Sequence, residues 1–387
     1  MLPIQPLSIF KRTDWLLSTV IILLAVFGLA AIYSIALSQN LGLTDLSASA
    51  GEMTGEFLNF KKQLAWLIIG LALMFFFANF DYHYLQKVSW LGYLLSLILL
   101  VLVLTPLGST LRGTRGWFSF GPLTFQPVEL TKVFLIIVLA DIYCRWSRII
   151  NQFKHLLLIG LVVFIPFVLT LIQPDFGSAM VLFFTWLISF FLVTKNKWHL
   201  VFILSSIILL FLTSWFFVFA DYQKDRIRTF VNPALDPLGS GYNVQQSIIA
   251  VGAGRLAGRG LGFGSQSQLK FIPESQTDFI FSVIAEELGF IGVIMVLGFF
   301  VFLFYRLYKI ALTAPDDFGL FLVILVAILI FIQVFINIGM NIGLLPVTGI
   351  SLPFVSYGGS FIIVMLILVG LVMNVYKSGL ISRRQKI

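Results

Sequence analysis

The sequence predicts an all-α integral membrane protein that crosses the bilayer about ten times. Of its 387 residues, 59% are apolar and only 11% are charged, and the mean hydropathy is +1.02. A soluble domain carries about 25% charged residues, so this chain has too few charges to cover a surface that faces water. The composition therefore excludes a soluble enzyme, a disordered protein and a disulfide-stabilised scaffold.

The predicted spans follow from the apolar runs, because a helix needs about 20 predominantly apolar residues to cross a bilayer. Such runs lie at about 15–37, 62–80, 84–105, 124–144, 155–173, 177–194, 198–220, 279–305, 318–341 and 352–376. The first run is too long for the core of a signal peptide and lacks a small-residue cleavage site, so we expect it to be retained. Residues 1–387 are thus expected to form one polytopic membrane domain.

The distribution of basic residues predicts the orientation. The formal net charge is +8, from 25 Lys and Arg against 17 Asp and Glu. With a cytoplasmic N-terminus, about fourteen basic residues fall in cytoplasmic segments and about four in short outer loops, which is the usual bias. We therefore expect both termini in the cytoplasm, as an even number of spans requires. This orientation explains the positive charge, and we expect no nucleic-acid partner.

Cysteine and histidine usage limits the chemistry further. Cys144 is the single cysteine, so an internal disulfide cannot form. The three histidines are far apart and have no zinc-binding spacing. They fall at predicted cytoplasmic ends, so histidine is not expected to be the base of a reaction on the outer face.

One connection is much longer than the others. Residues 221–278 form the predicted outer segment between the seventh and eighth spans, and loops beyond about 12–15 residues are usually functional or disordered. Apolar turns at 244–251 and 269–272 argue against disorder. We expect a compact, turn-rich structure on the outer leaflet.

Asp278 is the sharpest candidate for chemistry. It lies where the long segment meets the eighth span, after Pro273, which interrupts regular structure, and Thr277, which is a suitable N-cap. In one interpretation Asp278 only stabilises a helix N-terminus, where the macrodipole favours a negative charge. In the other it is a carboxylate base at the membrane interface, with Glu274 about one turn earlier as a second carboxylate.

Glu129 and Lys132 come next, at the outer end of the fourth span and on one helix face. Ionisable groups at membrane depth are costly and usually mark a pathway, a site or an internal pair. The pair could be a self-satisfied structural contact. Alternatively, the Lys132 ammonium faces a phosphate or a carboxylate and Glu129 holds it in place.

Other polar residues have weaker claims. Arg112 and Arg115 lie in an outer loop beside Trp117, where they could bind a lipid phosphate or simply anchor the loop to headgroups. Further polar residues are expected mainly to join helices: they are Gln173, Asp175, Glu286, Glu287, Asn337 and Asn341. Dinucleotide, P-loop and Gly-x-Ser-x-Gly motifs are missing from the sequence.

A set of short motifs, in order, covers nearly the whole chain. They are Arg115-Gly-Trp, Phe125-Gln-Pro-Val-Glu-Leu-Thr-Lys132, Gln173-Pro-Asp-Phe-Gly177, Asp236-Pro-Leu-Gly-Ser-Gly-Tyr242, Gln246-Ser, Phe271-Ile-Pro-Glu-Ser-Gln-Thr-Asp-Phe-Ile-Phe281, Glu286-Glu-Leu-Gly289, Leu345-Pro346 and Leu352-Pro-Phe-Val-Ser-Tyr-Gly-Gly-Ser360. With these motifs the chain resembles the SEDS (shape, elongation, division and sporulation) family of bacterial membrane proteins. Residues 264–269 and 285–288 resemble the rod-elongation branch more than the division branch. Lys270 replaces the family's usual acidic residue, and Ser275 and Gln276 replace its usual basic or histidine positions.

The resemblance implies a ten-span glycosyltransferase of the bacterial inner membrane that polymerises lipid II on its outer face. It also implies a class B penicillin-binding protein as partner, besides membrane lipids. The family's catalytic aspartate falls on Asp278. The family's Glu and Lys of the fourth span fall on Glu129 and Lys132. The residues expected to bind substrate are Lys132, Glu129, Arg115, Arg112, Glu274, Gln246, Ser356 and Tyr357.

The residues and the resemblance agree on one reaction. A sugar hydroxyl of one lipid II attacks the anomeric carbon of another, with Asp278 as base, and the lipid diphosphate leaves without a protonating acid. Cationic side chains or a divalent cation would balance the diphosphate charge, and no other cofactor is expected. A division polymerase, a lipid II flippase and a non-catalytic scaffold for the partner remain alternatives.

Overall fold

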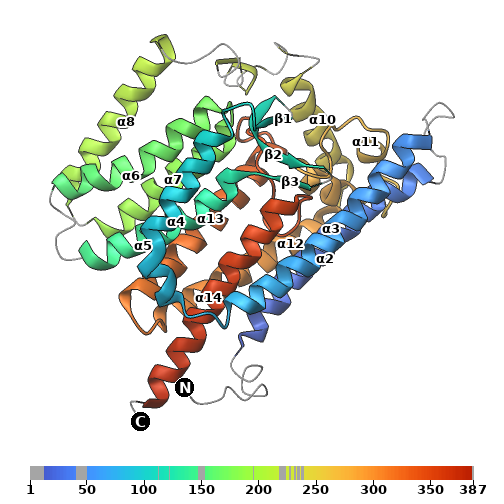
Figure 1. Cartoon of the computed structure of the whole chain (residues 1–387). Coiled ribbons are helices and arrows are strands. Elements are labelled where there is room, and N and C mark those ends of the chain that lie inside the picture. Colours follow the sequence, from blue (N-terminus) through green and yellow to red (C-terminus); the bar gives the residue numbers. More distant parts are fainter. Residues whose placement is uncertain are drawn as a thin grey trace.

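The computed structural model describes residues 13–40, 50–111, 113–121, 123–146, 153–194, 196–217, 224–225, 228–230, 232, 236 and 239–385. In this part of the chain, ten helices have 18 or more residues (Figure 1). They are α2 (Trp15–Asn40), α3 (Ala50–Phe77), α4 (Tyr82–Leu102), α5 (Pro127–Trp146), α6 (Phe153–Ile172), α7 (Phe176–Val193), α8 (Lys197–Phe217), α12 (Ile280–Leu312), α13 (Asp317–Asn341) and α14 (Gly359–Gln385). Each of them overlaps one predicted apolar run.

Seven of the described helices contain a stretch that is long and apolar enough to cross a membrane. These stretches are Trp15–Leu37, Phe57–Phe77, Tyr82–Leu102, Phe176–Val193, Ile280–Leu312, Asp317–Asn341 and Gly359–Arg383. α5 is more polar, because its sequence includes Glu129, Lys132, Asp141 and Arg145. The chain is therefore a multi-pass helical membrane protein, while the ten-span count and the sides of the termini stay predictions.

A small antiparallel sheet lies between α4 and α5, so the all-α prediction was wrong in this respect. Its strands are β1 (Ser109–Leu111), β2 (Thr114–Phe120) and β3 (Leu123–Phe125), in the order β1-β2-β3. Ser109 pairs with Trp117, and Phe118 pairs with Phe125. β2 has only seven residues, so a search for span-length apolar runs passes over it.

The described part of the 221–278 segment contains α10 (Ser240–Ala253) and α11 (Ser265–Gln268). α10 packs against α12 and α13, and α11 packs against α12 and α2. The segment is thus attached to the helical body close to the start of α12. Whether it lies outside the membrane stays a prediction.

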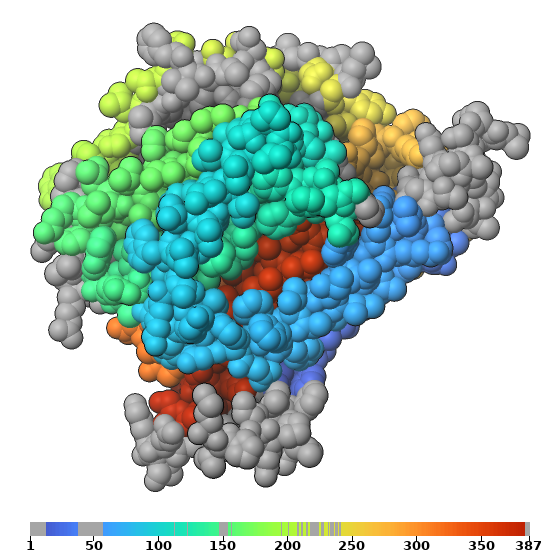
Figure 2. Space-filling view, in the orientation of Figure 1, coloured from blue at the N-terminus to red at the C-terminus, as the bar shows by residue number. Residues whose placement is uncertain are grey.

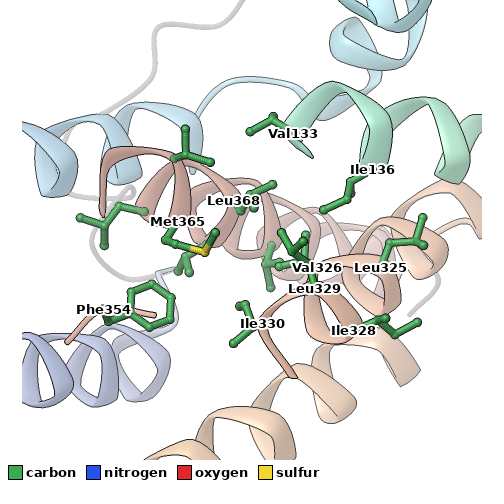
Figure 3. Packing of buried hydrophobic residues seen from close by; sticks show 14 of the residues in the cluster. Val133, Ile136, Leu325, Val326, Ile328, Leu329, Ile330, Phe354, Met365 and Leu368 are labelled. Atoms are coloured by element: carbon green, nitrogen blue, oxygen red, sulfur yellow. The ribbon is translucent and has the colours of Figure 1, made fainter. Parts of the chain in front are cut away.

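The core is centred on α13 and α14, which are the most buried of the candidate spans. Figure 3 shows Leu325, Val326 and Leu329 of α13 among Met365 and Leu368 of α14 and side chains of α5. Apolar residues cover most of the circumference of both helices, which is typical of helices enclosed by other helices. The rigid centre holds the N-terminal end of α5 and the C-terminal end of α13, where the candidate residues lie.

α12 is interrupted at Gly289, whose φ of +66° and ψ of −163° are outside the helical range. Glycine is suited to this conformation because it has no Cβ. Four backbone hydrogen bonds join the break to the preceding loop: Phe290 N–H to Arg255 O (2.8 Å), Ile291 N–H to Leu256 O (3.2 Å), Arg259 N–H to Glu286 O (3.0 Å) and Gly260 N–H to Glu287 O (2.9 Å). A helix break at membrane depth is tolerated where protein groups satisfy the backbone, as they do here.

Glu286 and Glu287 join α12 to its neighbours, as predicted. The Glu286 carboxylate accepts hydrogen bonds from the backbone N–H groups of Gln266 and Ser267 at 2.8 and 2.9 Å. The Glu287 carboxylate accepts from the Ser34 hydroxyl at 2.8 Å and from the Gln268 amide at 2.6 Å. Both glutamates are buried, so their first role is to hold the 254–268 loop against α12 and α2.

Candidate active site

Asp278 lies directly before α12, on a turn rather than in the helix. The helix begins at Ile280, and Phe279 occupies the N-cap without a side-chain hydrogen bond. The prediction that Thr277 caps the helix was wrong, because its hydroxyl donates instead to the Glu274 carboxylate, 3.0 Å away. Asp278 is half-buried and Glu274 is exposed. Glu274 also has a φ of +55°, a conformation that costs a non-glycine residue of the order of 1 kcal/mol.

The backbone of Asp278 is fixed by two amides from α13. The side chains of Asn337 and Asn341 each donate a hydrogen bond of 2.9 Å to the Asp278 carbonyl oxygen. Asn337 also donates to the Ile350 carbonyl at 2.7 Å. The two asparagines share a helix face, as predicted, and both are fully buried. The carbonyl oxygen of Asp278 is therefore hydrogen-bonded by two side-chain amides, one from Asn337 and one from Asn341.

A serine pair extends this network to α10. The Asn341 side-chain oxygen accepts from the Ser282 hydroxyl at 2.6 Å, and the Ser282 and Ser247 hydroxyls are 2.6 Å apart. Ser247 also donates to the Asn341 carbonyl at 2.7 Å. The predicted substrate residue Gln246 is the preceding, half-buried residue of α10. Three helices therefore meet in one polar cluster beneath Asp278.

The loop before α14 is bound to the backbone on the other side of Asp278. The Ser356 hydroxyl donates to the Thr277 carbonyl at 2.6 Å and accepts from the Leu352 N–H at 2.7 Å. The backbone N–H of Tyr357 donates to the Gln276 carbonyl at 2.9 Å. Ser356 is fully buried, so its hydroxyl positions the loop, while Tyr357 is half-buried.

Gly349 brings the same loop against the Asp278 carboxylate. A Cβ built at Gly349 would lie 3.6 Å from the Asp278 Oδ2 atom, and the φ of Gly349 is +75°. The space is sufficient for a methyl group, but the backbone conformation favours glycine. Asp278 is thus flanked by its own turn, by α13 and by the 342–358 loop.

Glu129 and Lys132 form the predicted ion pair in the first turns of α5. Lys132 Nζ lies 2.7 Å from Glu129 Oε1, and the side chains are 4% and 5% exposed. Lys132 Nζ also lies 5.9 Å from the ring centroid of Phe361, in the first turn of α14. The second Glu129 oxygen is buried and accepts no hydrogen bond from the described residues. The pair is therefore enclosed. Among the described residues, no group donates a hydrogen bond to the second Glu129 oxygen.

The same loop relates the ion pair to Asp278. Ser356 contacts Thr277, and Phe361 contacts Lys132. Ser356 and Phe361 are five residues apart in the sequence. Their Cα atoms are therefore at most about 18 Å from each other, even in an extended chain. The sequence places Lys132 and Asp278 in distant segments, and the 352–361 segment brings them into one region of the fold.

The predicted residue Arg115 lies on the small sheet, at the edge of this region. Arg115 is exposed on β2, and its guanidinium donates to the Thr105 carbonyl at 3.0 Å. Arg112 lies outside the described residues. The Ser360 hydroxyl of α14 donates to the Thr124 carbonyl of β3 at 3.1 Å, so the sheet is bound to the end of α14 that carries Phe361.

Figure 2 shows a recess on this face, with α14 as its floor. Its walls are α3 and α4, and the β2–β3 hairpin lies above it; α14 packs against all three of α3, α4 and β3. The side of the molecule that faces the viewer is thus hollowed between these elements. Ligand sites are usually concave, so this recess is a candidate substrate site.

Two residues of α3 that bind neighbouring loops were not predicted from the sequence. Gln63 donates to the Ser356 carbonyl at 3.1 Å and accepts from the Gly358 N–H at 3.0 Å. Asn59 donates to the Gln276 side-chain oxygen at 3.2 Å. The available signal was a polar residue, Gln63, inside the predicted span 62–80, because amides in membrane helices usually bind neighbouring helices.

The described residues contain no group of three or more His, Cys, Asp or Glu side chains that could hold a metal ion. Asp278 and Glu274 are two carboxylates on one turn. Magnesium is commonly bound by one or two carboxylates together with substrate phosphates. These residues therefore fit a cation that arrives with a diphosphate better than a resident metal.

These features define a multi-pass membrane protein with a carboxylate fixed at a helix entrance and an ion pair enclosed nearby. The chain matches the profile of the FtsW/RodA/SpoVE family, described as cell cycle proteins, over residues 14–379. It belongs to this family, which is the predicted SEDS family.

Several relatives match over most of their length. The chain is 40% identical to stage V sporulation protein E of Bacillus subtilis, covering 94% of this chain and 98% of the relative. It is 33% identical to the peptidoglycan glycosyltransferase MrdB of Escherichia coli, covering 82% and 85%. It is also 36% identical to the probable peptidoglycan glycosyltransferase FtsW of Trichlorobacter lovleyi, covering 94% and 92%.

Two solved structures have the same fold. A chain from a peptidoglycan synthase complex that coordinates polymerization and crosslinking superposes with a TM-score of 0.75 and 31% identity, covering 95% of this chain and 98% of that one. The rod shape determining protein RodA of Thermus thermophilus gives a TM-score of 0.67 and 28% identity, covering 95% and 97%.

Proposed function

We propose that this chain is a peptidoglycan glycosyltransferase that polymerises lipid II on the outer face of the bacterial inner membrane. The family relatives named as peptidoglycan glycosyltransferases support the activity. The observation that carries the proposal is the fixed position of Asp278. Its carbonyl oxygen accepts hydrogen bonds from two side-chain amides, and its carboxylate lies beside Gly349. A base must be held in place to act on one hydroxyl of a large substrate.

In the proposed reaction, the 4-hydroxyl oxygen of one lipid II attacks the anomeric carbon of a second lipid II. A new glycosidic bond forms, the bond to the lipid diphosphate breaks, and the hydroxyl proton passes to Asp278. A single displacement inverts the anomeric centre. The diphosphate is a good leaving group and needs no protonating acid, in contrast to the leaving group of a glycosidase.

The leaving diphosphate needs positive charge, and Lys132 is the proposed source. Its ammonium is enclosed with Glu129 and lies 5.9 Å from the centroid of the Phe361 ring, in the first turn of α14. Arg115, Arg112 or a divalent cation would add further positive charge. Glu274, Gln246 and Tyr357 are proposed to contact the sugars or phosphates, and Ser356 to position the loop.

We further propose ten spans, cytoplasmic termini and an outer 221–278 segment, because the basic residues are distributed accordingly. A class B penicillin-binding protein is the proposed partner, since a matching chain comes from a complex that coordinates polymerization and crosslinking. Cell elongation is the proposed role. The relatives include sporulation, FtsW and MrdB proteins, so a division role is the alternative.

The test uses the purified full chain, labelled lipid II, and reactions with and without a cognate penicillin-binding protein. Asp278→Asn should reduce polymerisation at least about 100-fold without loss of folding, because the hydrogen bonds to its backbone remain. Asp225→Asn is the control, since Asp225 is an exposed carboxylate paired with Arg228. Normal polymer yield from Asp278→Asn would contradict the assignment. Movement of lipid II across the bilayer without polymer would indicate a flippase, and neither activity would indicate a scaffold.

A further inference from the structure

A second cavity lies at the opposite end of α12 from Asp278. It has a volume of about 230 Å³, and its lining includes Arg306, Lys309 and Ile310 of α12 and Tyr376, Leu380 and Arg383 of α14. We call these six residues the basic pocket. Arg306 is 17 positions after the break at Gly289, roughly 25 Å along the rest of α12 at 1.5 Å per residue. The sheet and the C-terminal end of α14 also lie at opposite ends of the molecule (Figure 1), so the pocket is separate from the candidate active site.

The pocket is formed by a close crossing of two helices. A Cβ at Gly379 of α14 would collide with the backbone carbonyl of Thr313, at the end of α12. The glycine therefore allows the helix backbones to meet at this level. The crossing fixes the two helix backbones around the cavity, while the exposed Lys309 and Arg383 side chains form part of its lining.

Arg306 is held firmly in the wall of the pocket. Its Nε lies 2.8 Å from Asp14 Oδ2, where the arginine side chain is 19% exposed and the aspartate 1% exposed. Its guanidinium lies 5.3 Å from the ring centroid of Tyr376. Asp14 balances the Arg306 charge, so this pair contributes a fixed donor but little net charge.

Lys309 and Arg383 supply the net charge of the pocket. Within the described residues, neither side chain forms an ion pair with a carboxylate. Lys309 Nζ lies 5.5 Å from the ring centroid of Tyr305. Lys309 and Arg383 both line the cavity, so they add about two positive charges to it. Ile310 and Leu380 give the same cavity an apolar part.

A phosphate-bearing amphiphile matches this combination. A phosphodiester carries one negative charge and accepts hydrogen bonds from several donors at once. Basic pockets between membrane helices at a cytoplasmic surface bind the headgroups of anionic lipids. Two basic residues near the end of a helix could also act only on the helix dipole, but that role requires neither a cavity nor the enclosed Arg306.

We propose that the basic pocket binds the phosphate group of an anionic membrane phospholipid. Arg306, Lys309 and Arg383 bind the phosphate, and Ile310 and Leu380 contact the adjoining glycerol and acyl carbons. The site is distinct from the lipid II site proposed above and does not depend on the glycosyltransferase activity.

The experiment measures lipid binding by the full chain, delipidated in detergent. Phosphatidylglycerol is added in increasing amounts, with phosphatidylcholine as the neutral comparison, and bound lipid is counted by native mass spectrometry. Inorganic phosphate is titrated in a parallel series, with Tm as the readout, to distinguish a lipid headgroup from soluble phosphate. The test variant is Lys309→Gln with Arg383→Gln. The control is Lys154→Gln with Lys197→Gln, which removes the same charge from two exposed residues elsewhere.

The test variant should bind phosphatidylglycerol about thirtyfold more weakly, since it lacks two basic residues and each of them near a membrane surface contributes of the order of 1 kcal/mol. The control should bind as the original protein does. Lys309→Arg with Arg383→Lys should retain most binding, which separates loss of charge from loss of folding. Equal phosphatidylglycerol binding by all variants, or equal binding of phosphatidylcholine, would overturn the proposal. Protection by inorganic phosphate without selective lipid retention would overturn the lipid as the source of the phosphate.

Discussion

The side-chain amide of Asn341 donates a hydrogen bond of 2.9 Å to the backbone carbonyl oxygen of Asp278. The two residues are 63 positions apart in the sequence, and the bond joins the C-terminal end of α13 to the entrance of α12. Asn341 also accepts from Ser282. Together with Asn337, Asn341 therefore fixes the turn that carries the proposed base, and it is a positioning residue rather than a catalytic one.

Asn341→Leu should reduce the turnover of lipid II about tenfold or more and lower the Tm. The substitution keeps the branched shape of the side chain, although leucine is larger, and it leaves the Ser282 hydroxyl and the Asp278 carbonyl with fewer partners. A buried polar group without a partner costs about 1–3 kcal/mol. The matched control is Asn374→Leu, because Asn374 is equally enclosed and donates to the Ala78 carbonyl at 2.9 Å. We expect a similar fall in Tm but a smaller loss of turnover. Equal turnover in the two variants would mean that Asn341 only stabilises the fold.

The ion pair of α5 allows a sharper test of function against structure. Removing one member leaves a buried charge, which costs about 3–5 kcal/mol. Replacing both, as Lys132→Met with Glu129→Gln, should restore folding but not polymerisation, because the ammonium is proposed to balance the leaving diphosphate. Lys132→Arg should retain partial activity, since the charge remains but its geometry changes.

The control for that pair lies on the same helix. Arg145 Nε lies 2.8 Å from Asp141 Oδ1, and Asp141→Asn with Arg145→Met should leave polymerisation close to normal. The measurements are polymer yield and Tm for all variants. If Lys132→Met with Glu129→Gln polymerises lipid II normally, the pair is only structural, and the cation must come from Arg115 or a metal ion.

The sequence was sufficient for features that are encoded locally. Apolar runs identify the helices because each run by itself meets the length that a bilayer requires. The Glu129–Lys132 pair was predictable because residues three apart share a helix face. Asp278 was recognisable from Pro273 and the start of the next apolar run.

The contacts that assemble the site were not predictable, because they join distant segments. Ser356 reaches Thr277 across 79 positions, and Gln63 reaches Ser356 across 293. Side-chain amides and hydroxyls have several suitable partners in any membrane bundle, so their residue type does not select one. The hairpin was missed for a different reason: its short alternation of buried and exposed residues lies beside far longer apolar runs.

Gly349→Ala tests whether the loop beside Asp278 must keep its conformation. The φ of +75° strains any residue with a Cβ, at a cost of about 1–2 kcal/mol. We expect a lower Tm and a clear fall in polymerisation, because the strain is released next to the Asp278 carboxylate. Gly121→Ala is the control, since Gly121 has a φ of +63° and no heavy atom within 4 Å of a built Cβ. Its Tm should also fall, but its activity should remain.

The orientation can be tested by cysteine labelling in a Cys144→Ser background. Phe263→Cys lies in the predicted outer segment at a residue that is 71% exposed, and it should react with an impermeant maleimide added from the periplasmic side. Asp317→Cys lies at the exposed first residue of α13 and should react only after the membrane is permeabilised. The opposite pattern would place Asp278 on the cytoplasmic face and contradict the proposed reaction.

The break in α12 has a consequence for the dynamics of the protein. Because the amide protons of Phe290 and Ile291 are bound by Arg255 and Leu256 carbonyls, they should exchange with deuterated water as slowly as those of an uninterrupted helix. Opening the 255–260 turn would expose these amides and also release Glu286 and Glu287 from their backbone partners. The 255–260 turn and the first two helical turns of α12 should therefore open together as one cooperative unit. Asp278 should move with that unit rather than with the remainder of α12.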